Sequence, residues 1–169
     1  MSALYALMIG RGFLVYELTG SASYVGLVTG ASAAPSLIVG LLGGAVADRV
    51  DRGIVIQVGQ LLVAIGAFIV ALLTVTGLVN WVHLLVIAIV HGASSSFMWP
   101  ARQSMIAEIV DRDRLPNAMA LSSAASSSTS LIAPAIAGLL YAVVGPEGVF
   151  FMVCALSLSA VLLTSRVSH

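Results

Sequence analysis

The chain reads YVGLVTGASAAPSLIVGLLGGAVADRVDRG from Tyr24 to Gly53. Residues 24–47 carry no charge, and charged residues follow at once, at Asp48, Arg49, Asp51 and Arg52. As a helix, residues 24–47 would extend about 36 Å, enough to cross the roughly 30 Å hydrocarbon core of a bilayer with some tilt. This stretch therefore predicts a membrane-spanning helix that ends in a charged turn before the next helix.

The composition of the whole chain fits the same environment. Of 169 residues, 60% are hydrophobic and 8% are charged, against roughly 25% charged residues in a soluble domain. Seven Arg balance seven acidic residues and Lys is absent, which excludes a lysine-dependent ATP-binding loop and gives no support for a nucleic-acid partner. Because Cys154 is the single cysteine, neither an internal disulfide nor a cysteine metal site is expected.

Hydropathy divides the chain into six apolar segments bounded by Gly, Pro or charge. The expected helices span about 2–18, 24–47, 54–79, 81–98, 117–144 and 149–165. Spanning segments must satisfy their backbone hydrogen bonds internally, and long runs rich in Ala, Leu and Gly favour helices over the alternating strands of a membrane barrel. We therefore predict an all-α polytopic membrane protein, with residues 1–169 forming one domain of six transmembrane helices.

The arginines predict the orientation of these helices. They fall in alternate connections or beyond the last segment, at Arg49, Arg52, Arg102, Arg112, Arg114 and Arg166. The opposite connections, around Gly20, Asn80 and Pro146, contain none. By the positive-inside rule, both termini and the arginine-bearing loops are expected in the cytoplasm.

The charged turn after residue 47 resembles a signature of the major facilitator superfamily, a large family of secondary transporters. That signature lies between helices 2 and 3 and runs roughly Gly-x-Leu-Ala-Asp-Arg-x-Gly-Arg-Arg; this chain departs from it at Val46, Asp51 and Gly53. The resemblance implies a cytoplasmic gating loop whose Asp docks against a helix N-terminus in the other half of the transporter, a position that attracts carboxylates. The matching residues are Gly44, Asp48, Arg49 and Arg52. The simpler interpretation is a solvated loop that only sets topology.

Three further segments resemble the drug and siderophore exporter branch, which includes macrolide and enterobactin efflux proteins. They are Gly12–Val28, Trp99–Ala124 and Ala133–Gly145. Ala133, Pro134 and Gly138 resemble the antiporter motif Gly-Pro-x-x-Gly-Gly of helix 5, degraded by Ala where Gly is expected. The resemblance implies the N-terminal six-helix half of this fold, a 3+3 inverted repeat in a bacterial inner membrane. The first helix is expected to be clipped at its N-terminus and the C-terminal half to be absent.

Three ionisable residues inside the apolar segments are candidate functional groups: Arg11, Glu17 and His91. His83 lies near the outer end of its segment and is expected to be solvated or interfacial. A charge inside a membrane is costly and by default faces a cavity. Since the resemblance implies that helix 1 lines a central cavity, Arg11 is expected to bind substrate or take part in gating. Glu17 is either a cation or proton site or a solvated group near the outer surface. His91 either relays protons or forms hydrogen bonds within the core.

A further set of charges is expected on the cytoplasmic face. Its members are Arg102, Glu108, Asp111 and Arg112. They form either a network with Asp48 and Arg52 that holds one conformer shut, or a merely solvated turn.

These observations predict half of a secondary active transporter that exports a drug or siderophore by alternating access. It would use an ion gradient, of protons, and no cofactor or metal. The expected partners are the lipid bilayer, a small amphipathic substrate, and a second six-helix half or, less favoured, a second copy of the chain. A truncated, non-transporting fragment and a membrane scaffold are the alternatives. An intramembrane serine protease needs a Ser activated by a His on another helix, whereas HGASSS places both types on one helix, at His91–Ser96.

Overall fold

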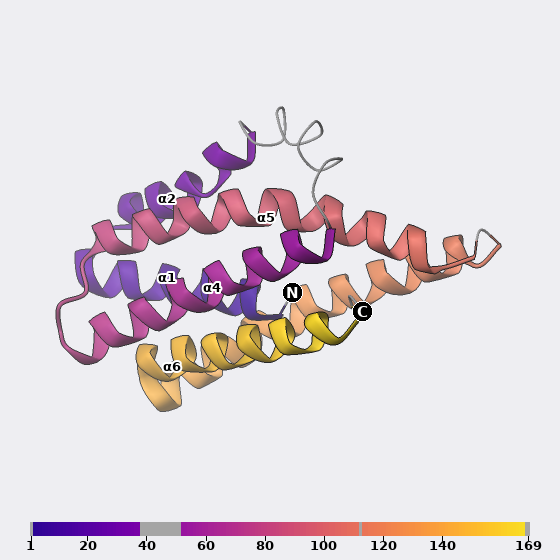
Figure 1. Ribbon diagram of the computed structural model, residues 1–169. Coiled ribbons are helices and arrows are strands. Elements are labelled where there is room, and N and C mark those ends of the chain that lie inside the picture. The colour runs from indigo at the N-terminus through magenta and orange to yellow at the C-terminus, as the bar shows by residue number, and fades with distance from the viewer. Residues whose placement is uncertain (1, 38–51, 112, 168–169) are drawn as a thin grey trace.

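The computed structural model describes residues 2–37, 52–111 and 113–167, and within these ranges the regular elements are helices (Figure 1). They are α1 (Ser2–Thr19), α2 (Ala22–Ala31), α4 (Arg52–Val75), α5 (Trp81–Ile109) and α6 (Leu115–Val167). Residues 33–37 are also helical. The prediction of an all-α protein is confirmed for the described residues. The gating-loop residues Gly44, Asp48 and Arg49 lie outside them, as does Arg112 of the charge network.

The predicted helix 24–47 is interrupted within its described part. α2 ends at Ala31, Ser32 forms a turn and the helix resumes at residue 33. Pro35 lacks the N–H that would bond to the carbonyl of Ala31. Instead, the Ser32 N–H donates to the Thr29 carbonyl at 3.3 Å, and its hydroxyl donates to the same oxygen at 2.6 Å. The proline thus interrupts the helical hydrogen bonding within an apolar run, while Ser32 keeps helical dihedral angles (φ −71°, ψ −22°).

α5 is longer than the apolar segment 81–98 that the sequence predicts as a span. The helix continues through Pro100 to Ile109. Hydropathy marks where the apolar segment ends, and a helix can continue beyond that point because its backbone hydrogen bonds are internal. One proline removes a single such bond and bends a helix without having to end it. At the other end, a capping box fixes the start of α5, with Asn80 Oδ1 accepting from Val82 N–H and His83 Nδ1 accepting from Asn80 N–H.

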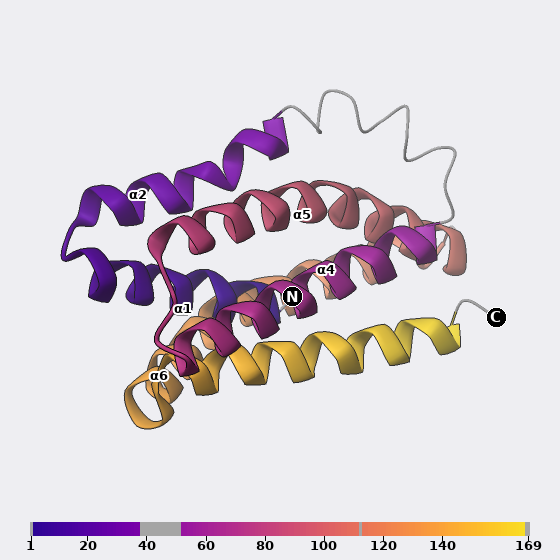
Figure 2. The same ribbon diagram turned by 60° about the vertical axis from the view of Figure 1, so that its left-hand side comes forward.

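α6 consists of two rods joined at Gly145. Its φ of 82° and ψ of 175° lie outside the helical region, in a part of φ/ψ space that is essentially restricted to glycine. Pro146 follows as the first residue of the second rod, where a missing N–H costs nothing. The chain reverses here and runs back along the bundle (Figure 2). The turn falls between the predicted helices 117–144 and 149–165.

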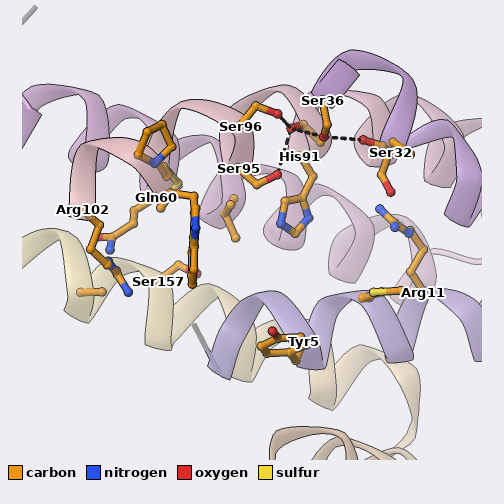
Figure 3. Close-up of a pocket in the computed structure, with 18 of the residues that line it drawn as sticks. Tyr5, Arg11, Ser32, Ser36, Gln60, His91, Ser95, Ser96, Arg102 and Ser157 are labelled. Atoms are coloured by element: carbon orange, nitrogen blue, oxygen red, sulfur yellow. Dashed lines mark hydrogen bonds between the residues drawn. The ribbon is translucent and has the colours of Figure 1, made fainter. Parts of the chain in front are cut away.

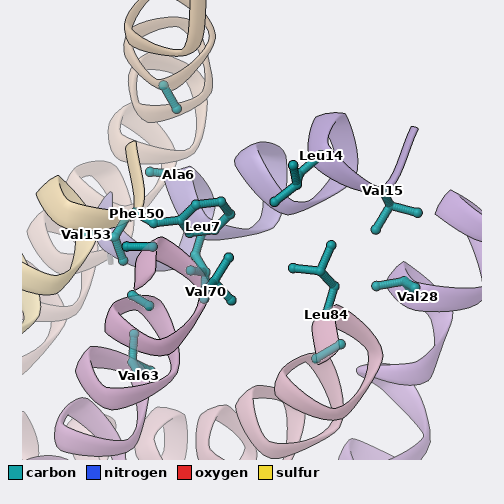
Figure 4. Packing of buried hydrophobic residues seen from close by; sticks show 14 residues of the cluster. Ala6, Leu7, Leu14, Val15, Val28, Val63, Val70, Leu84, Phe150 and Val153 are labelled. Atoms are coloured by element: carbon teal, nitrogen blue, oxygen red, sulfur yellow. The ribbon is translucent and has the colours of Figure 1, made fainter. Parts of the chain in front are cut away.

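The helices pack around one apolar core. α4 lies against α5 and α6, α1 against α2 and α6, and α2 against α5. Figure 4 shows side chains from all five helices meeting in this core. The largest fully buried ones are Leu7, Val15, Val28, Val70, Leu84, Val149, Phe150 and Val153.

The outer surface of the bundle is apolar. Three described helices, α4, α5 and α6, are long and apolar enough to cross a membrane. Large apolar side chains stand exposed along them, including Phe68, Leu72, Leu131, Leu139 and Val143. A soluble monomer rarely exposes so extensive an apolar surface. This surface is suited to lipid.

The connections gather at two ends of the bundle. Those around Gly20, residues 76–80 and Gly145 lie at one end (Figures 1 and 2). The start of α4, the connection from α5 to α6 and the C-terminal end of α6 lie at the other. Helices that follow one another in the chain therefore run in opposite directions through the bundle.

Candidate functional site

A cavity of about 750 Å³ opens inside the bundle. It is bordered by α1, α4, α5, the second rod of α6 and the residues just after α2. Its size is within the range of small-molecule sites, which are apolar with a few placed polar groups. The polar side chains on its wall are Tyr5, Arg11, Ser32, Ser36, Gln60, His91, Ser95, Ser96, Arg102 and Ser157 (Figure 3). Apolar walls come from Met8, Val63, Met98, Trp99, Leu156 and Ala160.

Arg11 is the most deeply buried charged residue of the described chain. Its side chain is 3% exposed, and its Nη1 has no hydrogen-bond partner among the described residues. Figure 3 shows the guanidinium reaching from α1 across the cavity toward Ser32, with His91 nearby. A charged side chain is costly in lipid, and Arg11 accordingly lies in a polar cavity inside the bundle. A role for Arg11 in substrate binding or gating stays a prediction.

A cluster of hydroxyls meets at the carbonyl of Gly92 on α5. This oxygen accepts from Ser95 at 2.9 Å and from Ser96 at 2.8 Å. The Ser36 hydroxyl lies 3.3 Å from it and 3.1 Å from the Ser32 carbonyl, and its single proton is shared between the two oxygens. Ser36 follows the break after α2, so the contact joins two segments far apart in the chain. The approach needs glycine, because a Cβ at position 92 would collide with the carbonyl of Ser32. Small residues thus let the broken helix and α5 close one side of the cavity.

His91 lines the cavity, but the serines beside it bond elsewhere. Ser94 donates to the Val90 carbonyl at 2.9 Å, while Ser95 and Ser96 donate to Gly92. These three hydroxyls are directed at main-chain oxygens of their own helix and not at His91. The arrangement gives no support to a Ser–His nucleophile in HGASSS.

Gln60 is a site residue that the sequence interpretation missed. It faces the cavity from α4, is 8% exposed, and its Oε1 has no hydrogen-bond partner within the described ranges. A buried polar atom without a partner is rare and costs free energy. The available signal was a pair of amides, Gln57 and Gln60, in the apolar stretch VIQVGQLLV (Val55–Val63).

Glu17 lies apart from Arg11 and His91. It is exposed and does not line the cavity. Its Oε2 accepts a hydrogen bond from Tyr141 Oη at 2.7 Å, and the Tyr141 ring lies 5.4 Å from that of Phe13. Glu17 therefore ties α1 to the first rod of α6. Its role as a cation or proton site stays a prediction.

The predicted charge network is divided in the structure. Arg52 Nη1 and Glu108 Oε2 form an ion pair at 2.7 Å between the start of α4 and the end of α5. Arg102 instead borders the cavity, as well as a smaller one of about 270 Å³ between α5 and α6. Asp111 is exposed. Because Asp48 and Arg112 lie outside the described residues, the network as a whole stays a prediction.

The exposed ion pair is expected to add little stability. Replacing Glu108 by Gln should lower the free energy of unfolding by less than about 1 kcal/mol at low salt, because water and side-chain entropy offset the attraction. The loss should shrink further at about 1 M salt, where the Debye length is about 3 Å. Thermal unfolding in detergent measures both effects, with the exposed Asp113→Asn as control. A loss of several kcal/mol, unaffected by salt, would contradict this prediction.

The degraded antiporter motif lies away from the cavity. α6 continues through Pro134. Ala133 and Ala137 are buried, and a Cβ at Gly138 would meet no atom within 4 Å. Ala133 and Ala137 are thus packed inside the bundle, and Gly138 borders open space. The part of the motif in antiport stays a prediction.

Comparison with known proteins decides the family. A major facilitator superfamily model described as "Transmembrane secretion effector" matches residues 3–168. The chain belongs to this superfamily. It is 30% identical over 172 residues to "Multidrug resistance protein 1" of Bacillus subtilis (strain 168), covering 97% of this chain and 42% of that protein. It is 28% identical over 152 residues to "Uncharacterized MFS-type transporter YfiS" of the same organism, covering 88% of this chain and 34% of that protein.

Membership in the major facilitator superfamily agrees with the apolar surface of the bundle. The chain is an integral membrane protein of a transporter family. It spans less than half the length of the two relatives it matches.

Proposed function

We propose that this chain is the N-terminal half of a secondary active transporter that exports small amphipathic molecules. The observation that carries the proposal is the cavity of about 750 Å³, with apolar walls and the buried Arg11, inside a bundle whose outside suits lipid. Membership in the major facilitator superfamily and the similarity to "Multidrug resistance protein 1" support it. In this proposal the family's exporter branch is that of drugs and siderophores, and the chain is not an enzyme.

The six helices form a 3+3 inverted repeat in this proposal. The first unit consists of α1, the second predicted helix, which includes α2, and α4. The second unit consists of α5 and the two rods of α6. The alternating direction of consecutive helices, by which α1 and α5 run in opposite directions, supports this division (Figure 2). Repeats of this kind rock against each other around a central site during alternating access.

Both termini face the cytoplasm of a bacterial inner membrane in this proposal. Arg52 begins α4, Arg102 lies toward the end of α5 and Arg114 precedes α6, so all three belong to the same end of the bundle. An excess of arginine marks the cytoplasmic side. The partners are a second six-helix half or, less favoured, a second copy of this chain.

A proton gradient drives export, without a cofactor, in this proposal. Glu17 and His91 are the titratable candidates along the helices. The loop with Gly44, Asp48, Arg49 and Arg52 would lock one conformer, since a carboxylate placed at a helix N-terminus gains about 1 kcal/mol.

Dye efflux from proteoliposomes tests the proposal. The full chain should export a lipophilic dye under a proton gradient, and an uncoupler should abolish export. Asp48→Asn should slow efflux about fivefold, the ratio that corresponds to about 1 kcal/mol. The exposed Asp113→Asn should leave the rate unchanged.

Two outcomes would count against a transporting half. Efflux that equals that of empty liposomes would favour the non-transporting fragment or scaffold. Equal rates for Asp48→Asn and the unmodified chain would limit the loop to setting topology.

A further inference from the structure

We propose that the cavity takes amphipathic anions, such as lipophilic carboxylates, in preference to cations. This inference rests on the proposed function and names its substrate class. Among the described residues that line the cavity, the charged ones are Arg11 and Arg102, and both are cationic. No Asp or Glu of the described ranges lines it.

The acidic residues of the described chain lie elsewhere. Glu17 accepts the hydroxyl of Tyr141, and Glu108 pairs with Arg52. Asp111 and Asp113 are exposed in the connection before α6, and Glu147 follows the turn at Gly145. None of them lies in the wall that Arg11 faces. The cavity therefore carries positive charge without a compensating carboxylate from these residues.

Arg11 is arranged to bind an anionic group. Its side chain is 3% exposed, and Nη1 has no partner among the described residues. An uncompensated charge in a site of low dielectric is costly, and pairing relieves that cost. A guanidinium also presents a planar fork of donors that matches a carboxylate or sulfonate. A cation placed here would be repelled and would leave the Nη1 donor unsatisfied.

The remaining wall defines the rest of the ligand. Met8, Met98 and Trp99 offer adaptable apolar surface for a hydrocarbon or aromatic body. Gln60 Oε1 has no partner and would accept a hydrogen bond from a donor on the ligand. In Figure 3, Gln60 and Arg102 lie toward one side of the cavity and Arg11 toward the other. An elongated acid with its carboxylate at Arg11 fits this distribution.

The two tryptophans of the chain permit a direct binding test. Trp99 lines the cavity, whereas Trp81 begins α5, and its ring centroid lies 4.9 Å from that of Tyr24. In a Trp81→Phe background, energy transfer from Trp99 reports a dansyl group in the cavity. The probes are 11-(dansylamino)undecanoic acid, its uncharged primary amide and a trimethylammonium analogue of the same length. The full chain is held in nanodiscs of zwitterionic lipid, and empty nanodiscs correct for partitioning.

We expect the acid to bind at least about tenfold more tightly than the amide or the ammonium analogue, as a hydrogen-bonded ion pair does. Arg11→Gln should weaken acid binding to the level of the amide while leaving amide binding unchanged, which also shows that the cavity is intact. Arg11→Lys should retain most of the preference. The exposed Arg114→Gln, a matched loss of charge outside the cavity, should have no effect.

Either of two results would overturn the inference. One is binding of the ammonium analogue as tight as that of the acid. The other is an equal loss of affinity for the acid in Arg11→Gln and Arg114→Gln, which would assign the preference for anions to surface charge. The assay needs no transport, so an Arg11-dependent preference without efflux would contradict the proposed function alone. Efflux of a neutral dye without this preference would contradict the substrate class alone.

Discussion

Replacing Gly92 by Ala is expected to lower the free energy of unfolding by about 2 kcal/mol or more. A Cβ at this position would collide with the main-chain carbonyl, carbonyl carbon and Cα of Ser32. Because these are backbone atoms, no side chain can rotate away, and the broken helix after α2 must shift. Overpacking of this kind costs about 1–3 kcal/mol even where side chains can adjust. Thermal unfolding in detergent measures the loss.

Gly138→Ala is the matched control for this substitution. Gly138 also lies within a helix, but a Cβ there would meet nothing within 4 Å. Alanine should be neutral there or should stabilise by up to about 1 kcal/mol, because it favours the helix over glycine. Equal stability of the Gly92 variant and the unmodified chain would mean that the Ser32 segment is not held against α5.

The Gly92 substitution should also change the cavity. Ser95 and Ser96 donate to the Gly92 carbonyl, and the Ser36 hydroxyl is shared between this oxygen and the Ser32 carbonyl. A shift of the Ser32 segment would break the contact from Ser36 and move the groups nearest the Arg11 guanidinium (Figure 3). We therefore expect weaker binding of the anionic probe together with the lower stability, and Gly138→Ala should change neither.

Phe150→Ala should lower the free energy of unfolding by about 3 kcal/mol. Phe150 is fully buried among α1, α4 and α6 (Figure 4). Truncating a buried Phe in soluble proteins costs about 3–5 kcal/mol, part transfer from water and part cavity formation. Lipid tails are as apolar as the core, so the loss here is chiefly of packing. The low end of the range is therefore expected.

The neighbouring Phe151 provides the control. It is 42% exposed on the outer surface, and its ring lies 6.3 Å from that of Phe68. Phe151→Ala should cost less than about 1 kcal/mol, since an aromatic pair contributes about 0.5–1.5 kcal/mol and lipid replaces the remaining contacts. Equal losses for Phe150 and Phe151 would contradict the orientation of the second rod of α6.

Much of the architecture was predictable from the order of residues. The scarcity of charge and the long apolar runs predicted the all-α fold, and Gly145 with Pro146 separated the last two predicted helices where the chain turns. Arg11 was predicted to face a cavity from the cost of burying its charge. These features depend on residues that are close together in the sequence and on the lipid around the protein.

Hydropathy was less informative where backbone bonding decided the outcome. It did not predict the break between Ala31 and residue 33 or the continuation of α5 past Pro100. Both proline-containing runs are similarly apolar, yet the helical hydrogen bonding is interrupted near Pro35 and the helix continues through Pro100. Hydropathy sums the transfer free energies of side chains and contains no term for the hydrogen bonds that follow a proline.

The composition of the cavity depended on packing between helices distant in the chain. Ser36 meets Gly92 across 56 positions, Gln60 faces the same space from α4, and Glu17 is held apart by Tyr141. The membrane environment, the apolar segments and the turn at Gly145 follow from residues close to one another in the chain, so the sequence alone predicts them. The rotation of each helix against its neighbours determines which polar side chains face the same cavity. Only the packing of the helices in the tertiary structure fixes that rotation.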